Sequence, residues 1–457
     1  MVSVLLSAIS GILLSGAFEP IGKWWLAPIA LAAHMYALTL SKRKILSSFV
    51  FALALNAIVL HWSSTFVGSI PWLILAIGMS IFYLPLALVS RWGIAAYPLI
   101  YIVMEEVRNR FPFGGFGWVR VAYTQADAPF AKIAAIGGAA ALSTIVVLLA
   151  LFIFSLSQRR VLLLVLTPFV LLLIPINTTN VGDTKVMMVQ GNVPEMGLDF
   201  NSRAKAVFNN HFKLTNIALA EDSNVDFVLW PENSVDVDPF RNADVKESLD
   251  SIRKPLIIGA VAYKGNKLLN TSILWGGELP PIYIKQHLTP FGEYIPLRSI
   301  ASKISPLTDR VRDFEPGQAS LFFTVNQAVI APVICFELLD DQILHQAAKG
   351  SNLLAVQTNS ATFGFSAESA QQLSITRVRA IEHGRNIVSV STTGYSAVID
   401  HQGKVLQKTS LGNAEVIRAQ VGLIEGQTPR DKAGHWALVG VLIFLLFVSV
   451  QAYKQRR

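Results

Sequence analysis

The chain has 457 residues, of which 52% are hydrophobic and only 15% are charged, and its formal net charge is +8. Ordinary soluble domains carry about 25% charged residues, so this composition, with a mean hydropathy of +0.48, excludes a purely soluble protein and favours one with membrane spans. The single cysteine excludes an internal disulfide. In a membrane protein a basic excess is typical of cytoplasmic loops, so it does not indicate nucleic-acid binding.

Apolar stretches gather in residues 1–176 and 434–450. A helix that crosses about 30 Å of hydrocarbon needs roughly 20 apolar residues, and on that basis we predict eight spans, some of them short or interrupted by glycine. They are 2–18, 24–40, 45–62, 71–90, 93–104, 130–156, 161–176 and 436–453. The first has no basic leader and no clear cleavage site, so we interpret it as a retained helix and not as a removed signal peptide.

Basic residues mark the loops on one side of the predicted spans. They follow the second, fourth, sixth and eighth spans, at 41–44, Arg91, 158–160 and 453–457. Because Lys and Arg are retained in the cytoplasm, both termini are predicted to be cytoplasmic and the segment between the last two spans to lie outside. This gives three parts, namely a membrane domain with seven spans (1–178), a domain outside the plasma membrane (179–430), and a C-terminal span with a basic tail (431–457).

The domain outside the membrane alternates strand-like and helix-like segments. Continuous apolar runs are typical of strands buried on both faces, and strands that alternate with helices favour a layered α/β domain. The predicted strands lie within 185–193, 225–232, 255–263, 270–276, 327–337, 352–358, 386–394 and 396–403, and the helices within 205–220 and 368–385.

Three places in this domain put ionisable residues at the end of an apolar, strand-like segment. Glu232 stands in WPENS, Lys285 and Glu293 in YIKQHLTPFGEYIP, and Cys335 and Glu337 in CFE. Side chains at strand ends build the sites of α/β folds. A carboxylate that removes the thiol proton and an ammonium that favours the thiolate and stabilises an oxyanion would complete a nucleophilic site.

Each of these motifs also has an ordinary structural interpretation. A lone cysteine after an apolar run is often a small core residue, and Glu232 could be a carboxylate at the start of a helix. Lys285 could lie in a solvated turn, and PFGEYIP could be only a loop punctuated by proline. The order of the motifs is more informative than any one of them.

The order Glu, Lys, Cys, each after an apolar strand, resembles the nitrilase superfamily. Within that superfamily the motifs resemble those of the bacterial apolipoprotein N-acyltransferases: WPENS, YIKQHLTPFGEYIP and ICFE, with GGFGWVRVAYTQ (114–125) and QGNVPE (190–195). The resemblance covers nearly the whole chain. It implies a multi-pass α-helical membrane domain and a nitrilase-like αββα sandwich domain.

The resemblance also implies a two-step acyl transfer. Cys335 would attack a membrane phospholipid, with Glu232 as general base and Lys285 stabilising the oxyanion, aided by the backbone N–H of Phe336. The thioester would then acylate the α-amino group of the diacylglyceryl-cysteine of an apolipoprotein. Glu293 and Glu337 would support the site, and no metal or soluble cofactor is expected.

Glu105 and Arg108 lie one helical turn apart near the predicted outer end of the fifth span. They could form an interfacial ion pair. Charged groups at membrane depth are also functional candidates, so we keep both residues, together with Trp118 of the following loop, as possible lipid-site residues.

The sequence departs from the usual family pattern in places that would line the acyl and acceptor region. Glycine stands at 117 where proline is frequent, and Phe336 replaces a tyrosine. Ser360 and Thr362 replace Asp and Trp. These departures bear on substrate preference and leave Glu232, Lys285 and Cys335 intact.

Two other functions remain open. A membrane-tethered amidase of the nitrilase type would use the same three residues with water as acceptor, but its eight spans would then have no mechanistic purpose. A non-enzymatic scaffold would predict a broken set of catalytic residues, whereas all three are present.

Overall fold

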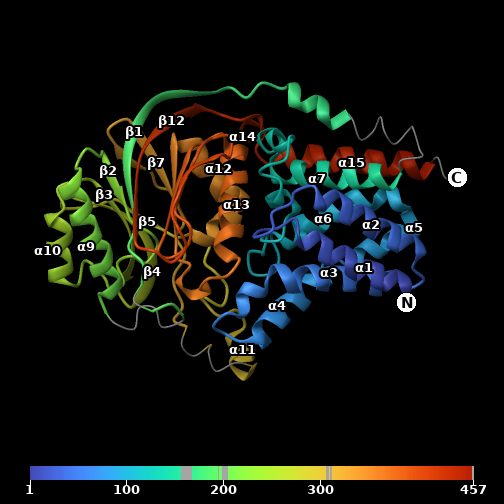
Figure 1. The fold of residues 1–457 in the computed structure, drawn as a ribbon, viewed down its shortest axis with the longest axis horizontal. Coiled ribbons are helices and arrows are strands. Elements are labelled where there is room, and N and C mark those ends of the chain that lie inside the picture. Colours follow the sequence, from blue (N-terminus) through green and yellow to red (C-terminus); the bar gives the residue numbers. More distant parts are fainter. Residues whose placement is uncertain (156–166, 194, 198–203, 305–307, 309–310, 455–457) are drawn as a thin grey trace. The chain divides into compact units, whose positions relative to one another are not determined.

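The computed structural model describes residues 1–155, 167–193, 195–197, 204–304, 308 and 311–454. Contacts between residues divide the chain into two compact units (Figure 1). The helical unit comprises residues 1–177, 370–382 and 427–457, and the sandwich unit comprises residues 178–369 and 383–426. Residues 370–382 therefore group with the helical unit, although they fall inside the predicted catalytic domain.

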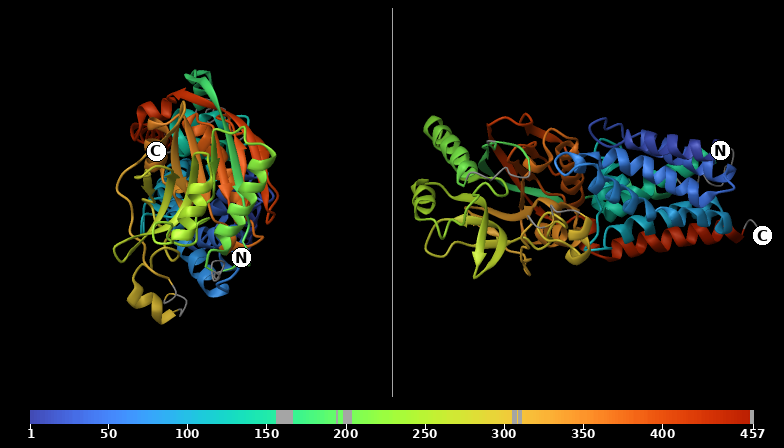
Figure 2. Two further views of the ribbon diagram at one scale, coloured as in Figure 1. Left: turned by 90° about the vertical axis from the view of Figure 1, so that its left-hand side faces the viewer. Right: turned by 90° about the horizontal axis from the view of Figure 1, so that it is seen from below.

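The helical unit is a bundle whose helices run side by side (Figures 1 and 2). Its helices are α1 (Val2–Ser15), α2 (Leu26–Leu40), α3 (Lys44–Val59), α4 (Ser69–Ile81), α5 (Val89–Trp92), α6 (Tyr97–Arg108), α7 (Ala134–Phe154), α14 (Pro429–Ala433) and α15 (Trp436–Lys454), with most of α13 (Glu368–His383). Small residues permit close packing, because a Cβ on Gly11 of α1 would lie 2.2 Å from the carbonyl oxygen of Phe51 in α3.

Two helical segments, Ser69–Trp92 and Ala131–Phe154, are long and apolar enough to cross a membrane. Val2–Ser15, Leu26–Leu40, Lys44–Val59 and Trp436–Gln451 are apolar but shorter. The loop 158–160, the first part of the predicted span 161–176 and the tail 455–457 lie outside the described residues, whereas Thr167–Leu173 forms a 3₁₀ helix. The count of eight spans therefore stays a prediction.

The sandwich unit contains two six-stranded sheets, with strand orders β12-β1-β2-β3-β4-β5 and β11-β10-β9-β8-β7-β6. The first sheet consists of β1 (Thr178–Gln190), β2 (Phe227–Leu229), β3 (Leu256–Lys264), β4 (Lys267–Trp275), β5 (Ile282–Ile284) and β12 (Glu415–Gly426). The second consists of β6 (Phe323–Val325), β7 (Ala328–Ile334), β8 (Leu353–Thr358), β9 (Ile387–Ser391), β10 (Ala397–Ile399) and β11 (Val405–Lys408).

Alternate residues of β1 pack on opposite faces of the first sheet, as the period of two in a strand requires. Val186 and Met188 join residues of the second sheet in one core, whereas Met187 and Val189 pack with α9 (Ala206–Glu221) and α10 (Ala243–Ser251). On the second sheet, α12 (Asp341–Gly350) packs against β7 and β8. A further short helix of this unit is α11 (Arg298–Ile304).

This layering of helices, sheet, sheet and helices confirms the predicted αββα sandwich. Each of the eight predicted strand segments contains a strand, and both predicted helices form. Strands β5, β6, β11 and β12 and the helices α10, α11 and α12 had no prediction. Edge strands such as β11 leave most residues exposed and so show no continuous apolar run.

Candidate active site

Cys335 begins a sharp turn where β7 ends and a 3₁₀ helix, Cys335–Leu339, starts. Its φ is +49°, in the left-handed region that residues with a Cβ adopt only at a cost. The residue keeps some exposed surface, whereas Ile334 and Phe336 on either side are buried. The turn therefore presents the thiol while its neighbours anchor the strand end.

Lys285 follows β5 directly and is held by two carboxylates. Its Nζ lies 2.8 Å from Oε2 of Glu293 and 3.2 Å from Oε1 of Glu232, and its side chain is only 1% exposed. A buried charge is stable only when it is paired and hydrogen-bonded. The structure thus brings together the two predicted ionisable motifs of the first sheet.

Asn270 of β4 joins the same two carboxylates. Its Nδ2 donates to Oε1 of Glu232 at 2.8 Å and to Oε1 of Glu293 at 2.6 Å. Its carbonyl accepts the N–H of Lys285 at 2.9 Å. Asn270 had no prediction, although a polar side chain inside a buried strand signals a hydrogen-bond partner.

The segment that carries Glu232 passes unusually close to β3. A Cβ on Gly259 would lie 2.3 Å from the carbonyl oxygen of Pro231 and 2.6 Å from Cα of Glu232, so only glycine fits there. Asn233, directly after Glu232, has a φ of +54°. The tight turn after β2 therefore depends on a residue without a side chain in the neighbouring strand.

The electrostatics of the site favour a neutral thiol in the resting enzyme. Burial, and next the Glu232 carboxylate, raise the pKa of Cys335 well above its usual value, and Lys285 opposes them only in part. The Lys285 ammonium favours the thiolate, as expected, but burial and the Glu232 charge together have the larger effect. Because burial also raises the pKa of Glu232, against the pull of Lys285, this carboxylate is a better base than an exposed one.

Lys285 and Glu293 form the charged part of the site. Burial works against the Lys285 ammonium, but Glu232 and Glu293 together raise its pKa above the usual value. Burial likewise works against the Glu293 carboxylate, but Lys285 and the Asn270 amide lower its pKa overall. The ammonium therefore stays charged and can stabilise an oxyanion.

Glu337 ties the strand end of Cys335 to the segment of Lys285. Its Oε2 accepts the N–H of Ile334 at 2.7 Å, and its Oε1 accepts the N–H of Gln286 at 2.6 Å and the hydroxyl of Tyr283 at 2.7 Å. Burial raises the pKa of Glu337 to about 7. This geometry suits the supporting role that the resemblance implies.

Phe336 and Glu368 complete the surroundings of Cys335. The Phe336 ring meets the His287 ring edge to face, with centroids 5.1 Å apart. Glu368 is 2% exposed and interacts electrostatically with Cys335. Glu368 had no prediction, because the helix dipole is usually a sufficient reason for an acidic residue at a helix start.

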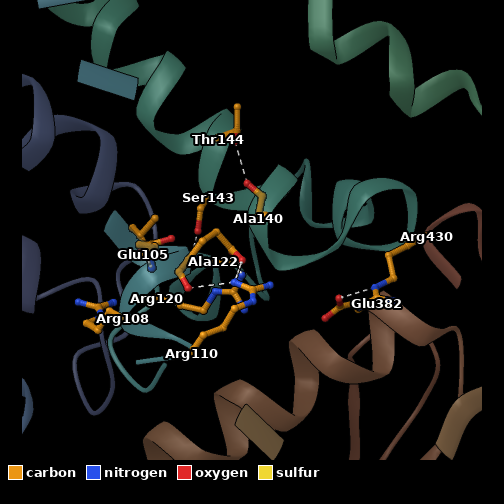
Figure 3. A network of polar contacts seen from close by, with 12 residues as sticks. Glu105, Arg108, Arg110, Arg120, Ala122, Ala140, Ser143, Thr144, Glu382 and Arg430 are labelled. Atoms are coloured by element: carbon orange, nitrogen blue, oxygen red, sulfur yellow. Dashed lines mark hydrogen bonds and ion pairs between the residues drawn. The ribbon is translucent and has the colours of Figure 1, made fainter. Parts of the chain in front are cut away.

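Two of the possible lipid-site residues, Glu105 and Arg108, bind protein groups in the helical unit (Figure 3). Arg108 donates to the Tyr83 hydroxyl at 2.8 Å and to the Val119 carbonyl at 2.7 Å, and Glu105 accepts the N–H of Val121 at 2.8 Å. Both side chains are buried and hold the loop after α6. Their role toward lipid stays a prediction.

Trp118 in that loop donates from Nε1 to Oε1 of Gln371 at 2.6 Å, and its ring lies 4.9 Å from that of Trp62. The preceding glycine is packed and not loose, because a Cβ on Gly117 would lie 1.9 Å from Oδ1 of Asn109. The neighbouring Arg120 is buried and forms an ion pair with Glu106.

Comparison with known proteins places both parts of the chain in described families. Residues 10–152 match the apolipoprotein N-acyltransferase N-terminal domain, and residues 185–428 match the carbon-nitrogen hydrolase family. Among solved structures, a mutant of the Nesterenkonia AN1 amidase from the nitrilase superfamily is 14% identical and aligns with a TM-score of 0.43 over 58% of this chain and 98% of its own.

Two curated relatives cover almost the whole chain. The apolipoprotein N-acyltransferase of Mycolicibacterium smegmatis is 32% identical over 96% of this chain and 84% of its own length. That of Haemophilus influenzae is 27% identical over 99% of this chain and 95% of its own. With its two-part match and a relative that is 32% identical over 96% of this chain, the protein belongs to the apolipoprotein N-acyltransferase family.

Proposed function

We propose that this protein transfers an acyl chain from a membrane phospholipid to the α-amino group of the diacylglyceryl-cysteine of an apolipoprotein. The main support is the buried ion pair between Lys285 and Glu232, which interacts electrostatically with the Cys335 thiol, whose pKa burial raises. The family supports the lipoprotein acceptor and the lipid donor. The roles of the individual residues are part of the proposal.

In the first half-reaction Glu232 takes the proton of the Cys335 thiol as the sulfur attacks the ester carbonyl. The oxyanion that forms is stabilised by the Lys285 ammonium, with the Phe336 N–H as a further donor. When the ester C–O bond breaks, the leaving alkoxide takes the proton from Glu232. The products are a thioester on Cys335 and a lysophospholipid, and Glu232 is again a carboxylate.

In the second half-reaction the neutral amine of the acceptor attacks the thioester carbonyl. Glu232 takes the amine proton as the tetrahedral intermediate forms, and the C–S bond then breaks. The departing thiolate recovers the proton from Glu232. An amide leaves and the free enzyme is restored, so the cycle is of the ping-pong type.

The proposal includes a location. The catalytic unit lies outside the plasma membrane, held at both ends by membrane-spanning helices, with both termini cytoplasmic. Both substrates carry their reactive groups at headgroup level, and an anchored unit meets them there without leaving the membrane. The apolar helices of the helical unit and the basic loops support this arrangement.

A two-stage labelling experiment tests the proposal. Purified protein is incubated with phospholipid that carries a labelled acyl chain, and Cys335 is examined by peptide mass spectrometry for a thioester. A diacylated lipopeptide is then added. Transfer of the label to its α-amino group is expected, whereas release to water alone would favour an amidase-like hydrolase.

Two variants make the assignment specific. Cys335→Ala should abolish labelling, and Cys335→Ser should reduce it severely, because a hydroxyl is a poorer nucleophile near neutral pH. Full labelling of Cys335→Ala would refute the assignment of the nucleophile.

A further inference from the structure

The second sheet brings three reactive side chains to one edge. Strands β7, β8 and β9 are parallel, with Ile334 opposite Gln357 and Thr358 opposite Ser391. Cys335 follows β7, Ser360 follows β8, and Ser391 ends β9. Because the carboxyl ends of parallel strands share one edge of a sheet, a row of hydroxyls continues away from the thiol.

These hydroxyls converge on the turn at Gly394. A Cβ built there would lie 2.6 Å from Oγ of Ser360, 2.6 Å from Oγ of Ser369 and 2.7 Å from Oγ of Ser391. The three serines, which we call the serine cluster, are all buried. Next to the turn, the buried Oγ1 of Thr393 has no hydrogen-bond partner among the described residues.

Glu368 adds one carboxylate to the serine cluster. It accepts a hydrogen bond from Oγ of Ser369 at 3.2 Å and another from the hydroxyl of Ser360. An acidic residue in the first helical turn usually needs only the helix dipole and solvent. Glu368 is instead 2% exposed and bound to hydroxyls, so its position carries a desolvation cost without an evident structural purpose.

Glu368 also interacts electrostatically with Cys335 and Glu232. Its carboxylate contributes to the raised pKa of the Cys335 thiol. Burial, with a contribution from Glu232, raises the pKa of Glu368 to about 7. The site thus has a further carboxylate, at the start of α13, which the two half-reactions described above do not use.

We propose that Glu368 receives the α-ammonium group of the acceptor and takes its first proton before the amine attacks the thioester. The inference rests on the proposed function and deepens it. An α-amino group has a pKa of about 7.7–8.0, so the acceptor arrives mainly as a cation that cannot act as a nucleophile. A buried carboxylate among hydroxyl oxygens suits such a cation.

The proton balance requires two acceptors. The ammonium carries three protons and the amide product keeps one. Glu368 takes the first proton and releases it to solvent after the product leaves. Glu232 takes the second during the attack and passes it to the Cys335 thiolate when the C–S bond breaks. No oxidant, metal or co-reactant is needed.

The test separates proton removal from the rest of catalysis. Glu368→Gln keeps the shape, and serine hydroxyls can donate to or accept from an amide, so the fold should tolerate it. The acyl-enzyme is formed with labelled phospholipid and then mixed with either the diacylated lipopeptide or hydroxylamine. Hydroxylamine is uncharged at neutral pH and needs no preliminary deprotonation.

We expect Glu368→Gln to form the acyl-enzyme at nearly the normal rate. It should transfer the acyl chain to the lipopeptide about 100-fold more slowly, yet react normally with hydroxylamine. Glu368→Asp should recover part of the lipopeptide rate. Glu278→Gln, which removes the same charge from an exposed loop, is the matched control and should behave as the wild type.

The other outcomes overturn the inference. Equal slowing with lipopeptide and hydroxylamine would show a distorted site, and normal transfer to lipopeptide would show that Glu368 plays no part. Failure of the wild-type protein to form a thioester would instead refute the proposed function itself, so the two failures are distinguishable.

Discussion

The ammonium of Lys285 lies closer to Glu293, at 2.8 Å, than to Glu232, at 3.2 Å. Glu293 is therefore a second counter-ion of the lysine, beside Glu232. When Glu232 takes a proton and loses its charge, Lys285 still has a carboxylate partner. The second carboxylate thus lets the base change protonation state without leaving a buried cation unpaired.

The first prediction concerns Glu293→Gln. Glu293 raises the pKa of Glu232, and its removal also leaves Lys285 with Glu232 as its carboxylate partner, so the pKa of Glu232 should fall. The acid limb of the acylation rate should move to lower pH, and the rate on the plateau should drop about 10- to 100-fold, because the base is weaker. A stopped-time pH profile of thioester formation measures both. An unmoved acid limb would contradict this account.

Asn270→Leu should have the opposite effect on the acid limb. The Asn270 amide lowers the pKa of both carboxylates by hydrogen bonding, so its loss should move the limb to higher pH. The unmet acceptors should also cost about 1–3 kcal/mol of stability. Ser272→Ala on the same strand is the control, since that buried hydroxyl has no hydrogen-bond partner in the part of the chain that the structure describes.

Removal of the central cation by Lys285→Met should abolish thioester formation and destabilise the sandwich unit. Two buried carboxylates would face each other without a cation, and breaking a buried pair in this way costs about 3–5 kcal/mol. Thermal unfolding in detergent should show a clear loss. Adding Glu232→Gln and Glu293→Gln should restore much of the thermal stability but no activity, which separates the structural role of Lys285 from its catalytic one.

A stability profile against pH gives the fourth prediction. Burial raises the pKa of Glu368 from 4.5 to about 7, so the folded state binds its proton more tightly than the unfolded state. The stabilisation of the folded state by this proton is complete below pH 4.5 and is lost as pH rises through 7. The free energy of unfolding falls by at most about 1.4 kcal/mol per pH unit. Glu368→Gln should flatten the fall in melting temperature over this range. Glu278→Gln should keep the wild-type slope.

A layered α/β domain and the reactive strand ends could be predicted from the sequence pattern, and the resemblance to the family implied the αββα sandwich. The stretches 186–189 and 353–356 are continuously apolar because both faces of those strands are buried. Glu232 and Cys335 could be found because each follows such a run, and Lys285 because its motif stands between theirs in the order Glu, Lys, Cys. Their meeting at one place was an inference from topology; in the structure Lys285 and Glu232 form an ion pair.

Other features depend on contacts distant in sequence. Asn270 is important because β4 lies beside β5, and Glu368 because α13 begins at the end of the second sheet where Cys335 stands. Strand β12 pairs with β1 across more than 200 residues of chain, and its alternating exposure gave no apolar run to recognise. Helix lengths in the helical unit likewise depend on local breaks such as Gly138, whose φ is +77°.

The high pKa of the Cys335 thiol also affects how long the enzyme survives between turnovers. Oxidants attack cysteine as the thiolate, so a cysteine held protonated is slow to become sulfenic acid. The same burial that makes the enzyme depend on Glu232 for each turnover thus protects its only sulfhydryl from oxidative damage. Reactivity arises only when a substrate and the base act together, which is a useful property for a protein that has no second cysteine to form a protective disulfide.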